Sequence, residues 1–103
     1  MATIHHAHMR LCCSKLTYDI CFNLKVIDEP SCSCGAEIEN AFHFFFECPF
    51  YADIRNDLTN IITLMTTPNI NFLLYGNPKL NYEQNKELFS VVHLYIIKSN
   101  RFK

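Results

Sequence analysis

The chain has 103 residues, half of them apolar, with a formal net charge of −1 and six cysteines. This length predicts a single domain, 1–103, with a thin core to which a bound metal would add folding free energy. The charge argues against a strongly basic surface. No apolar run has transmembrane length and no secretory signal is visible. We therefore expect an intracellular protein, cytoplasmic or nuclear, with reduced cysteines.

The amino-terminal third predicts one short helix followed by an exit turn. Three histidines cluster in the apolar segment 1–13: His5, His6 and His8. No acid or cysteine stands beside them in a ligand pattern, so we expect no specific metal site there. Thr17 can cap a helix over 18–24, whose apolar residues follow helical spacing. Pro30 then keeps the preceding residue out of helical geometry.

The segment 30–51 carries a possible ligand set in a Cys-x-Cys, His, Cys pattern: Cys32, Cys34, His43 and Cys48. Three thiolates and one imidazole complete a tetrahedral Zn²⁺ shell without an open position, which is typical of one structural ion and not of a catalytic one. The alternative is that these cysteines pack as small apolar side chains and the histidine is a hydrogen-bonded core residue. The remaining cysteines are expected to serve packing only: Cys12, Cys13 and Cys21.

The residues around the four candidate ligands support the metal interpretation. Gly35 permits the tight turn that a cysteine knuckle needs. Asn40 can cap a short helix that places the histidine in its first turn. Pro49 disfavours helical geometry at the preceding cysteine, so the chain can turn back to the metal there. On a helix, Glu39 and Glu47 lie four residues either side of the histidine, and either can orient the imidazole from outside the ligand shell.

The expected helix over 41–47 is apolar nearly all round. In α-helical geometry, Phe42, Phe45 and Phe46 share one side, while Phe44 points about a hundred degrees away from its neighbour. We therefore expect the first three rings to be buried and Phe44 to be the most exposed. A helix without a polar face must be covered on every side, so one ring can face a partner protein.

The remainder of the chain predicts three further helices. The first begins at Pro49 and has an apolar stripe at helical spacing: Phe50, Ile54, Leu58, Ile61, Ile62 and Met65. A short apolar helix within 69–75 follows and ends at Gly76-Asn77-Pro78. Asn81 and Gln84 form a capping box for the last helix, whose stripe is Leu88, Val91, Val92, Tyr95 and Ile96. Without strand-like alternation, the fold is predicted to be all-α: a small zinc-stabilised helical domain of about five short helices.

The metal motif also carries a family resemblance. The residues that match are Pro30-Ser31-Cys32-Ser33-Cys34-Gly35-Ala36, Glu39, His43-Phe44-Phe45-Phe46, Cys48-Pro49, Tyr51 and Arg55. They resemble the zinc-binding segment that lies carboxy-terminal to the reverse transcriptase of LINE-type (non-LTR) retrotransposons. Weaker similarity extends over Arg10-Leu11, Ser14-Lys15-Leu16, Gly76-Asn77-Pro78 and Arg101-Phe102. The resemblance implies the same four zinc ligands and a fragment of a larger polyprotein, which assists RNA or DNA binding beside an upstream polymerase domain.

No catalytic pattern accompanies this motif. Tyr51-Ala52-Asp53-Ile54 lacks the second aspartate that a two-metal polymerase site needs. His43 and Cys48 resemble a base and nucleophile pair, but zinc ligation uses both, and no third group orients them. A P-loop, a nucleophile elbow and a dinucleotide fingerprint are absent from the sequence. We therefore expect no enzymatic activity, no small-molecule substrate and no membrane partner.

Three functional hypotheses remain open from the sequence. The first is a non-catalytic zinc-binding tail that contacts RNA or DNA through its basic residues: Arg10, Lys15, Lys25, Lys98, Arg101 and Lys103. The second is a protein-interaction module that uses the phenylalanine-rich helix. The third is a decayed fragment without a selected function.

Overall fold

The computed structural model describes residues 2–11, 14–23 and 29–102. Within them the chain forms four α-helices: α1 (Ala2–Arg10), α2 (Ala52–Met65), α3 (Ile70–Tyr75) and α4 (Tyr82–Ser99). Three single turns complete the helical elements: the π-helical η1 (Asp19–Asn23) and η2 (His43–Glu47), and the 3₁₀ turn η3 (Pro49–Tyr51). No strand occurs in these described ranges, and the predicted all-α class is confirmed. None of the described helices combines the length and apolar character needed to cross a bilayer.

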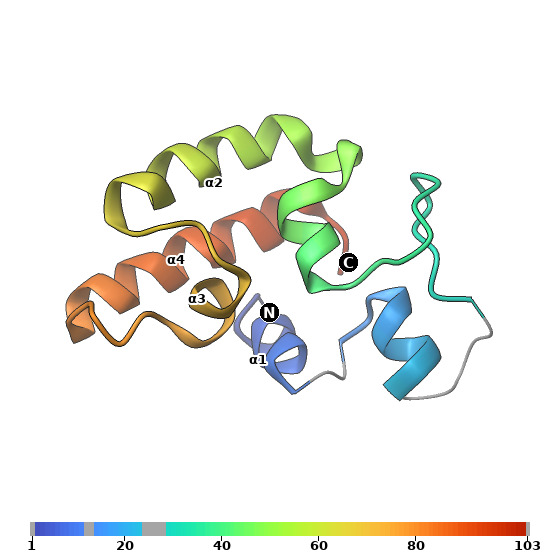
Figure 1. Cartoon of the computed structure of the whole chain (residues 1–103), viewed down its shortest axis with the longest axis horizontal. Helices are drawn as coiled ribbons and strands as arrows, with labels where there is room; N and C mark the ends of the chain where they lie inside the picture. Colours follow the sequence, from blue (N-terminus) through green and yellow to red (C-terminus); the bar gives the residue numbers. More distant parts are fainter. Residues whose placement is uncertain (1, 12–13, 24–28, 103) are drawn as a thin grey trace.

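Helices α2 and α4 lie side by side and run antiparallel, while α1 and α3 pack on the other side of α4 (Figure 1). The chain measures 41 × 26 × 22 Å along its principal axes. Its carboxyl end returns to η2, where the ring of Phe102 lies 5.4 Å from that of Phe44. The core therefore joins the metal motif directly to the helical pair.

The predicted end of α3 at Gly76 and the predicted capping box of α4 are confirmed. Asn69 accepts a hydrogen bond from an amide in the first turn of α3, which ends at Gly76 with φ of 85°. An added Cβ at Gly76 would lie 3.1 Å from Asn85 Oδ1. Glycine therefore suits this turn because of its positive φ and because a side chain would have little room. Asn81 and Gln84 form the expected capping box of α4. Local hydrogen bonding thus fixes these boundaries.

The apolar stripes are confirmed over the α-helices but not before them. In α4, the side chains of Leu88, Val92, Tyr95 and Ile96 are buried, and Val91 is partly buried. In α2, Leu58 and Ile62 are buried, and Ile54 and Met65 pack against the core. Ile61, also in the stripe, is 38% exposed. Phe50 was expected in the same stripe but is 61% exposed. It lies in the 3₁₀ turn η3, whose residue spacing differs from that of α2.

The predicted capping role of Thr17 is wrong. Its hydroxyl donates to the carbonyls of Pro30 (2.7 Å) and Ser31 (2.8 Å) and so ties the first helical turn to the metal loop. The amide of Leu16 donates instead to the hydroxyl of Ser14, which lies two residues before it. The Thr17 side chain therefore binds a loop that lies far away in the sequence and does not cap its own helix. Local sequence patterns do not predict such a contact. The expected end of this helix at residue 24 lies outside the described residues.

The predicted orientation of the phenylalanine-rich helix is also wrong. Phe44 and Phe45 are fully buried, Phe42 is 47% exposed, and Phe46 is only partly buried. The rings of Phe42 and Phe46 do lie together, 5.2 Å apart, but on the outer side. The turn is π-helical, because the Cys48 amide donates to the carbonyl five residues earlier. Its wider turn directs two adjacent rings inward, which α-helical spacing does not anticipate.

Candidate metal centre

The four predicted ligands lie together although they are spread over seventeen residues. One ligand atom from each of Cys32, Cys34, His43 and Cys48 lies within 4.8 Å of all the others. The Cys32 and Cys48 sulfurs are 3.8 Å apart, and Cys34 Sγ is 3.4 Å from His43 Nε2. Cys34 is partly exposed and the other three are buried. This group could hold a metal ion.

The loop that carries the first two cysteines is a tight knuckle. The amide of Gly35 donates to the carbonyl of Cys32 (3.0 Å), and the amide of Cys32 donates to the carbonyl of Ala36 (3.0 Å). Gly35 has φ of 100°, a conformation that side chains disfavour. The predicted glycine turn therefore brings the two cysteines to the same side of the loop.

The second pair of ligands is placed by the boundaries of η2. Asn40 Oδ1 accepts a hydrogen bond from the His43 amide (2.9 Å), which confirms the predicted cap. Cys48 has extended geometry with ψ of 122°, as the proline after it predicts. Arg55 donates to the carbonyls of Phe45 (3.0 Å) and Cys48 and so satisfies the open end of the turn. Sequence reasoning assigned no such role to Arg55.

Burial keeps two of the candidate sulfur ligands as neutral thiols when no cation is present. Burial raises the pKa of the Cys32 thiol to about 12 and also raises the pKa of Cys48. The backbone amide of Ala36 lowers the pKa of Cys34. Buried thiols remain neutral unless a positive charge stabilises their thiolates. A divalent cation supplies that charge at the centre of the group, so the donor set fits a metal.

The two acidic residues expected near the imidazole occupy different positions. Glu47 Oε1 lies 3.8 Å from His43 Nδ1 and is largely exposed, so its orienting role stays a prediction. Glu39 precedes η2 and is directed elsewhere, because its carboxylate accepts from Arg101 and from the Cys32 thiol (Sγ–Oε2 3.7 Å). Burial alone would raise the pKa of Glu39, but Arg101 and the Thr17 amide hold that pKa below its usual value. Glu39 therefore acts beside a cysteine and not beside the histidine.

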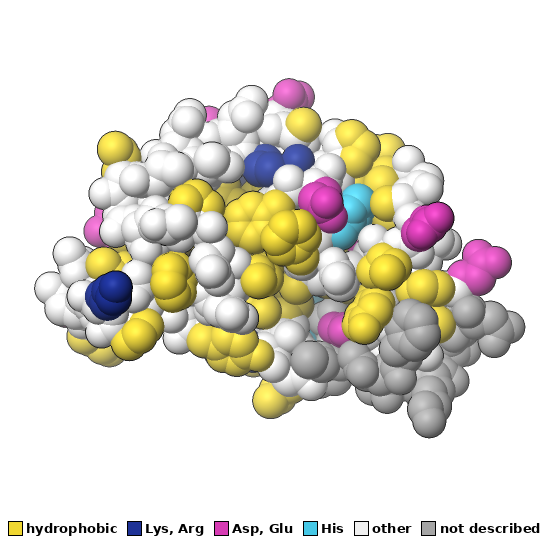
Figure 2. All heavy atoms as spheres, in the orientation of Figure 1, with side chains coloured by type: hydrophobic (Ala, Val, Ile, Leu, Met, Phe, Trp, Pro, Cys, Tyr) yellow, Lys and Arg dark blue, Asp and Glu magenta, His cyan; other side chains and the backbone are white. Residues whose placement is uncertain are grey.

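The predicted nucleic-acid residues do not all face solvent. Arg10 donates to the Leu74 carbonyl and to His6 (3.0 Å), and its guanidinium lies 5.1 Å from the Phe89 ring centre. Arg101 is engaged with Glu39. The remaining two described members, Lys15 and Lys98, are exposed, whereas Lys25 and Lys103 lie outside the described residues. On the face seen in Figure 2, the Lys and Arg side chains are separated. Arg10 and Arg101 therefore serve the fold.

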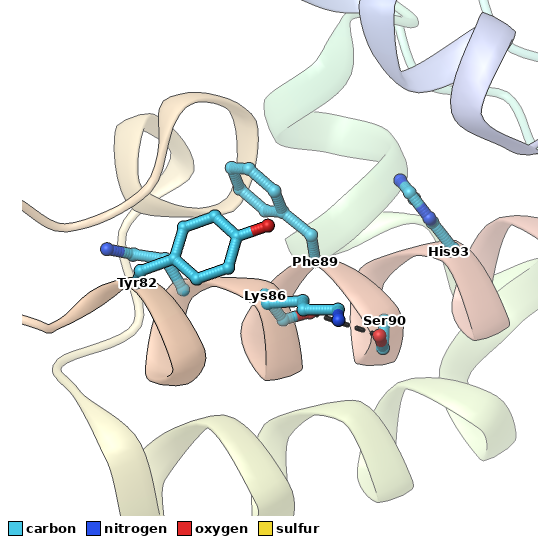
Figure 3. Close-up of a pocket in the computed structure, with 6 residues that line it drawn as sticks. Tyr82, Lys86, Phe89, Ser90 and His93 are labelled. Carbon is cyan, nitrogen blue, oxygen red and sulfur yellow. Dashed lines mark hydrogen bonds between the residues drawn. The ribbon is translucent and has the colours of Figure 1, made fainter.

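A hollow along α4 was not anticipated from the sequence. It is mostly apolar and is lined by Tyr82, Asn85, Lys86, Phe89, Ser90 and His93 (Figure 3). The Ser90 hydroxyl donates to the Lys86 carbonyl (3.0 Å) within the helix. The His93 ring pairs with His6 through nitrogens 2.9 Å apart. These polar groups are used in the fold, and the hollow carries no recognisable chemistry.

Comparison with family models, with curated proteins and with solved structures gives no match. The most specific feature of the described residues is the cluster of three cysteines and one histidine, which local turns bring together and which could hold a metal ion.

Proposed function

We propose that Cys32, Cys34, His43 and Cys48 bind one Zn²⁺ and that the ion stabilises a non-catalytic domain. The observation that carries this is the spacing of the ligand atoms. Tetrahedral zinc with Zn–S bonds of about 2.3 Å separates two sulfurs by about 3.8 Å, and a sulfur from an imidazole nitrogen by about 3.5 Å. One sulfur pair, Cys32 with Cys48, is 3.8 Å apart, and Cys34 Sγ is 3.4 Å from His43 Nε2, while all four ligand atoms lie within 4.8 Å of one another.

The composition of the shell supports a structural ion. Three thiolates and one imidazole fill all four positions, so none is left for a water or a substrate. Cys32, His43 and Cys48 are buried, which limits access to the ion. A zinc ion in such a shell contributes folding free energy and supplies no nucleophile.

The ion would connect two parts of the chain that contribute differently to the fold. Cys32 and Cys34 belong to the glycine knuckle, whereas His43 and Cys48 begin and follow η2. The same turn directs Phe44 and Phe45 into the core. Zinc would therefore fix the loop to the turn and hold both rings in place. The free energy of metal binding would in this way add to the stability that the thin core provides.

We further propose, from the sequence resemblance, that the domain is the zinc-binding tail of a LINE-type reverse transcriptase. The support is that the four residues that the resemblance implies as ligands lie together. Contact with RNA or DNA would then use exposed lysines such as Lys15 and Lys98. Binding to a single-stranded RNA should weaken steeply with salt, because phosphate neutralisation releases counterions. Fluorescence anisotropy at two salt concentrations tests this, and salt-insensitive or undetectable binding would contradict it.

A protein-interaction role is favoured by one specific observation. Phe42 is 47% exposed beside Phe46, and the two rings line a hollow with Pro68, Asn69, Ile70 and Asn71. Exposed aromatic rings gathered in a hollow are typical of contact surfaces. In the reverse-transcriptase setting, the partner would be the upstream polymerase domain. Salt-insensitive association with that domain, weakened by Phe42→Ala, would support this second role.

The zinc proposal predicts a stoichiometry. Native mass spectrometry of the purified chain should show one zinc per molecule, and Cys34→Ser should lose it, because a hydroxyl is a far weaker zinc ligand than a thiolate. Cys21→Ser is the matched control and should retain the metal, since Cys21 lies outside the ligand group. A metal-free wild-type chain with unchanged helicity would rule out the proposal.

A further inference from the structure

A partly buried ion pair lies directly against the candidate metal centre. Glu39 is 3% exposed and accepts two hydrogen bonds from the Arg101 guanidinium, at 2.8 Å from Nε and 2.6 Å from Nη2. The Thr17 amide donates to the same carboxylate at 3.0 Å. The Cys32 thiol also faces it, with Sγ 3.7 Å from Oε2. One ligand of the candidate site is therefore in contact with a carboxylate that Arg101 neutralises.

The chain reaches this arrangement through an unusual turn after α4. Asn100 adopts a left-handed conformation with φ of 55°, which asparagine tolerates better than most residues. The turn directs Arg101 back across the protein, where it also donates to the Lys15 carbonyl at 3.0 Å. Arg101 and Glu39 are 62 residues apart in the sequence. The pair is thus a built tertiary contact and not a chance surface encounter.

Metal binding changes the charge that faces Glu39. Without metal, the neutral Cys32 thiol donates its proton toward the carboxylate. With zinc bound, this cysteine is a thiolate and has no proton to donate. A shell of three thiolates, one neutral imidazole and Zn²⁺ has one net negative charge. An ionised carboxylate beside it repels the thiolate unless a cation compensates.

We propose that Arg101 is a positioning residue of the metal centre. It raises the affinity of the site for zinc by neutralising Glu39 beside the Cys32 thiolate. The inference rests on the proposed zinc site and adds an outer residue to it. The two hydrogen bonds from the Arg101 guanidinium hold the Glu39 carboxylate in one orientation, and the guanidinium cancels the negative charge of this carboxylate. Residues outside the ligand shell commonly change metal affinity by about 10–100-fold when they are replaced.

The test compares zinc affinities by competition with a chromophoric chelator. Arg101→Gln should weaken zinc binding about tenfold or more, because it leaves Glu39 uncompensated. Glu39→Gln should retain wild-type affinity or exceed it, since its amide can donate to the thiolate. The double variant Arg101→Gln with Glu39→Gln should recover most of the loss. Lys98→Gln is the matched control, because it removes an exposed positive charge from the last turn of α4, shortly before Arg101, and should leave affinity unchanged.

The outcomes separate this inference from the zinc proposal. Recovery in the double variant identifies charge compensation, which a purely structural clamp would not show. If the wild-type chain binds one zinc and the double variant binds as weakly as Arg101→Gln, the inference is wrong and the zinc site stands. Equal affinity of Arg101→Gln and wild type would also overturn it. A wild-type chain without metal affinity would overturn both.

Discussion

Replacing Phe44 with alanine should lower the free energy of unfolding of the zinc-loaded domain by about 3–5 kcal/mol. Phe44 is fully buried, and its ring lies 5.2 Å from Tyr95, 5.3 Å from Tyr51 and 5.4 Å from Phe102. Truncation would remove these contacts and leave a cavity where η2, α4 and the carboxyl end meet. Urea denaturation with excess zinc measures the effect.

Phe42→Ala is the matched control, because it removes the same number of atoms from the same helical segment. Phe42 is 47% exposed, so its truncation should cost less than about 1 kcal/mol. If Phe42→Ala destabilised the domain as much as Phe44→Ala, the inward direction of Phe44 would be incorrect. Zinc content measured in parallel ensures that both variants are compared in the metal-bound state.

The same phenylalanines show where sequence reasoning succeeds and where it fails. Asn40 and Asn81 cap helical turns as predicted, because each cap depends on a residue three positions away. The rotation of η2 about its axis depends instead on its π-helical turn and on Tyr95, more than forty residues later. Tyr95 donates a hydrogen bond to the Phe44 carbonyl, which no local pattern can predict.

The candidate site likewise has a part that the sequence predicts and a part that it does not. The four candidate ligands could be predicted to lie together, because cysteine and histidine at short spacing with a glycine turn form a local signal. The surroundings of the ligands could not, since Thr17, Arg55 and Arg101 approach from other parts of the chain. Arg101 was expected to contact nucleic acid as one of the basic residues near the carboxyl end of the chain. Only the tertiary structure reveals its buried carboxylate partner.

A second large effect is expected from His6, which is fully buried between three helices. Its Nε2 donates to the Leu73 carbonyl (2.7 Å), so Nδ1 carries no proton in the neutral ring. Nδ1 accepts from Arg10 (3.0 Å) and lies 2.9 Å from His93 Nε2. A second proton on His6 would therefore point at a guanidinium and at another imidazole.

These surroundings make the stability of the domain depend on pH. Burial, with smaller effects from Arg10 and His93, outweighs the Leu73 carbonyl, which acts in the opposite direction, and lowers the pKa of His6 from 6.5 to about 4. Below pH 6.5 the unfolded chain gains a proton on this residue, which the folded chain takes up only near pH 4. The contribution of neutral His6 is thus fully present above pH 6.5 and decreases as the pH falls through this window. Between pH 7.5 and pH 5.0 we expect a loss of about 2 kcal/mol from His6 alone.

The measurement is the free energy of unfolding in urea at both pH values for wild type and His6→Gln. The variant is expected to be less stable at pH 7.5 but to lose about 2 kcal/mol less on acidification, because glutamine does not titrate. Proton competition at the cysteines is common to both proteins and cancels in this difference. His8→Gln on the same helix serves as the control, since His8 is only partly buried, and it should follow the wild-type pH dependence. If His6→Gln lost as much stability as wild type between the two pH values, the histidine would not be held neutral by its burial beside Arg10 and His93.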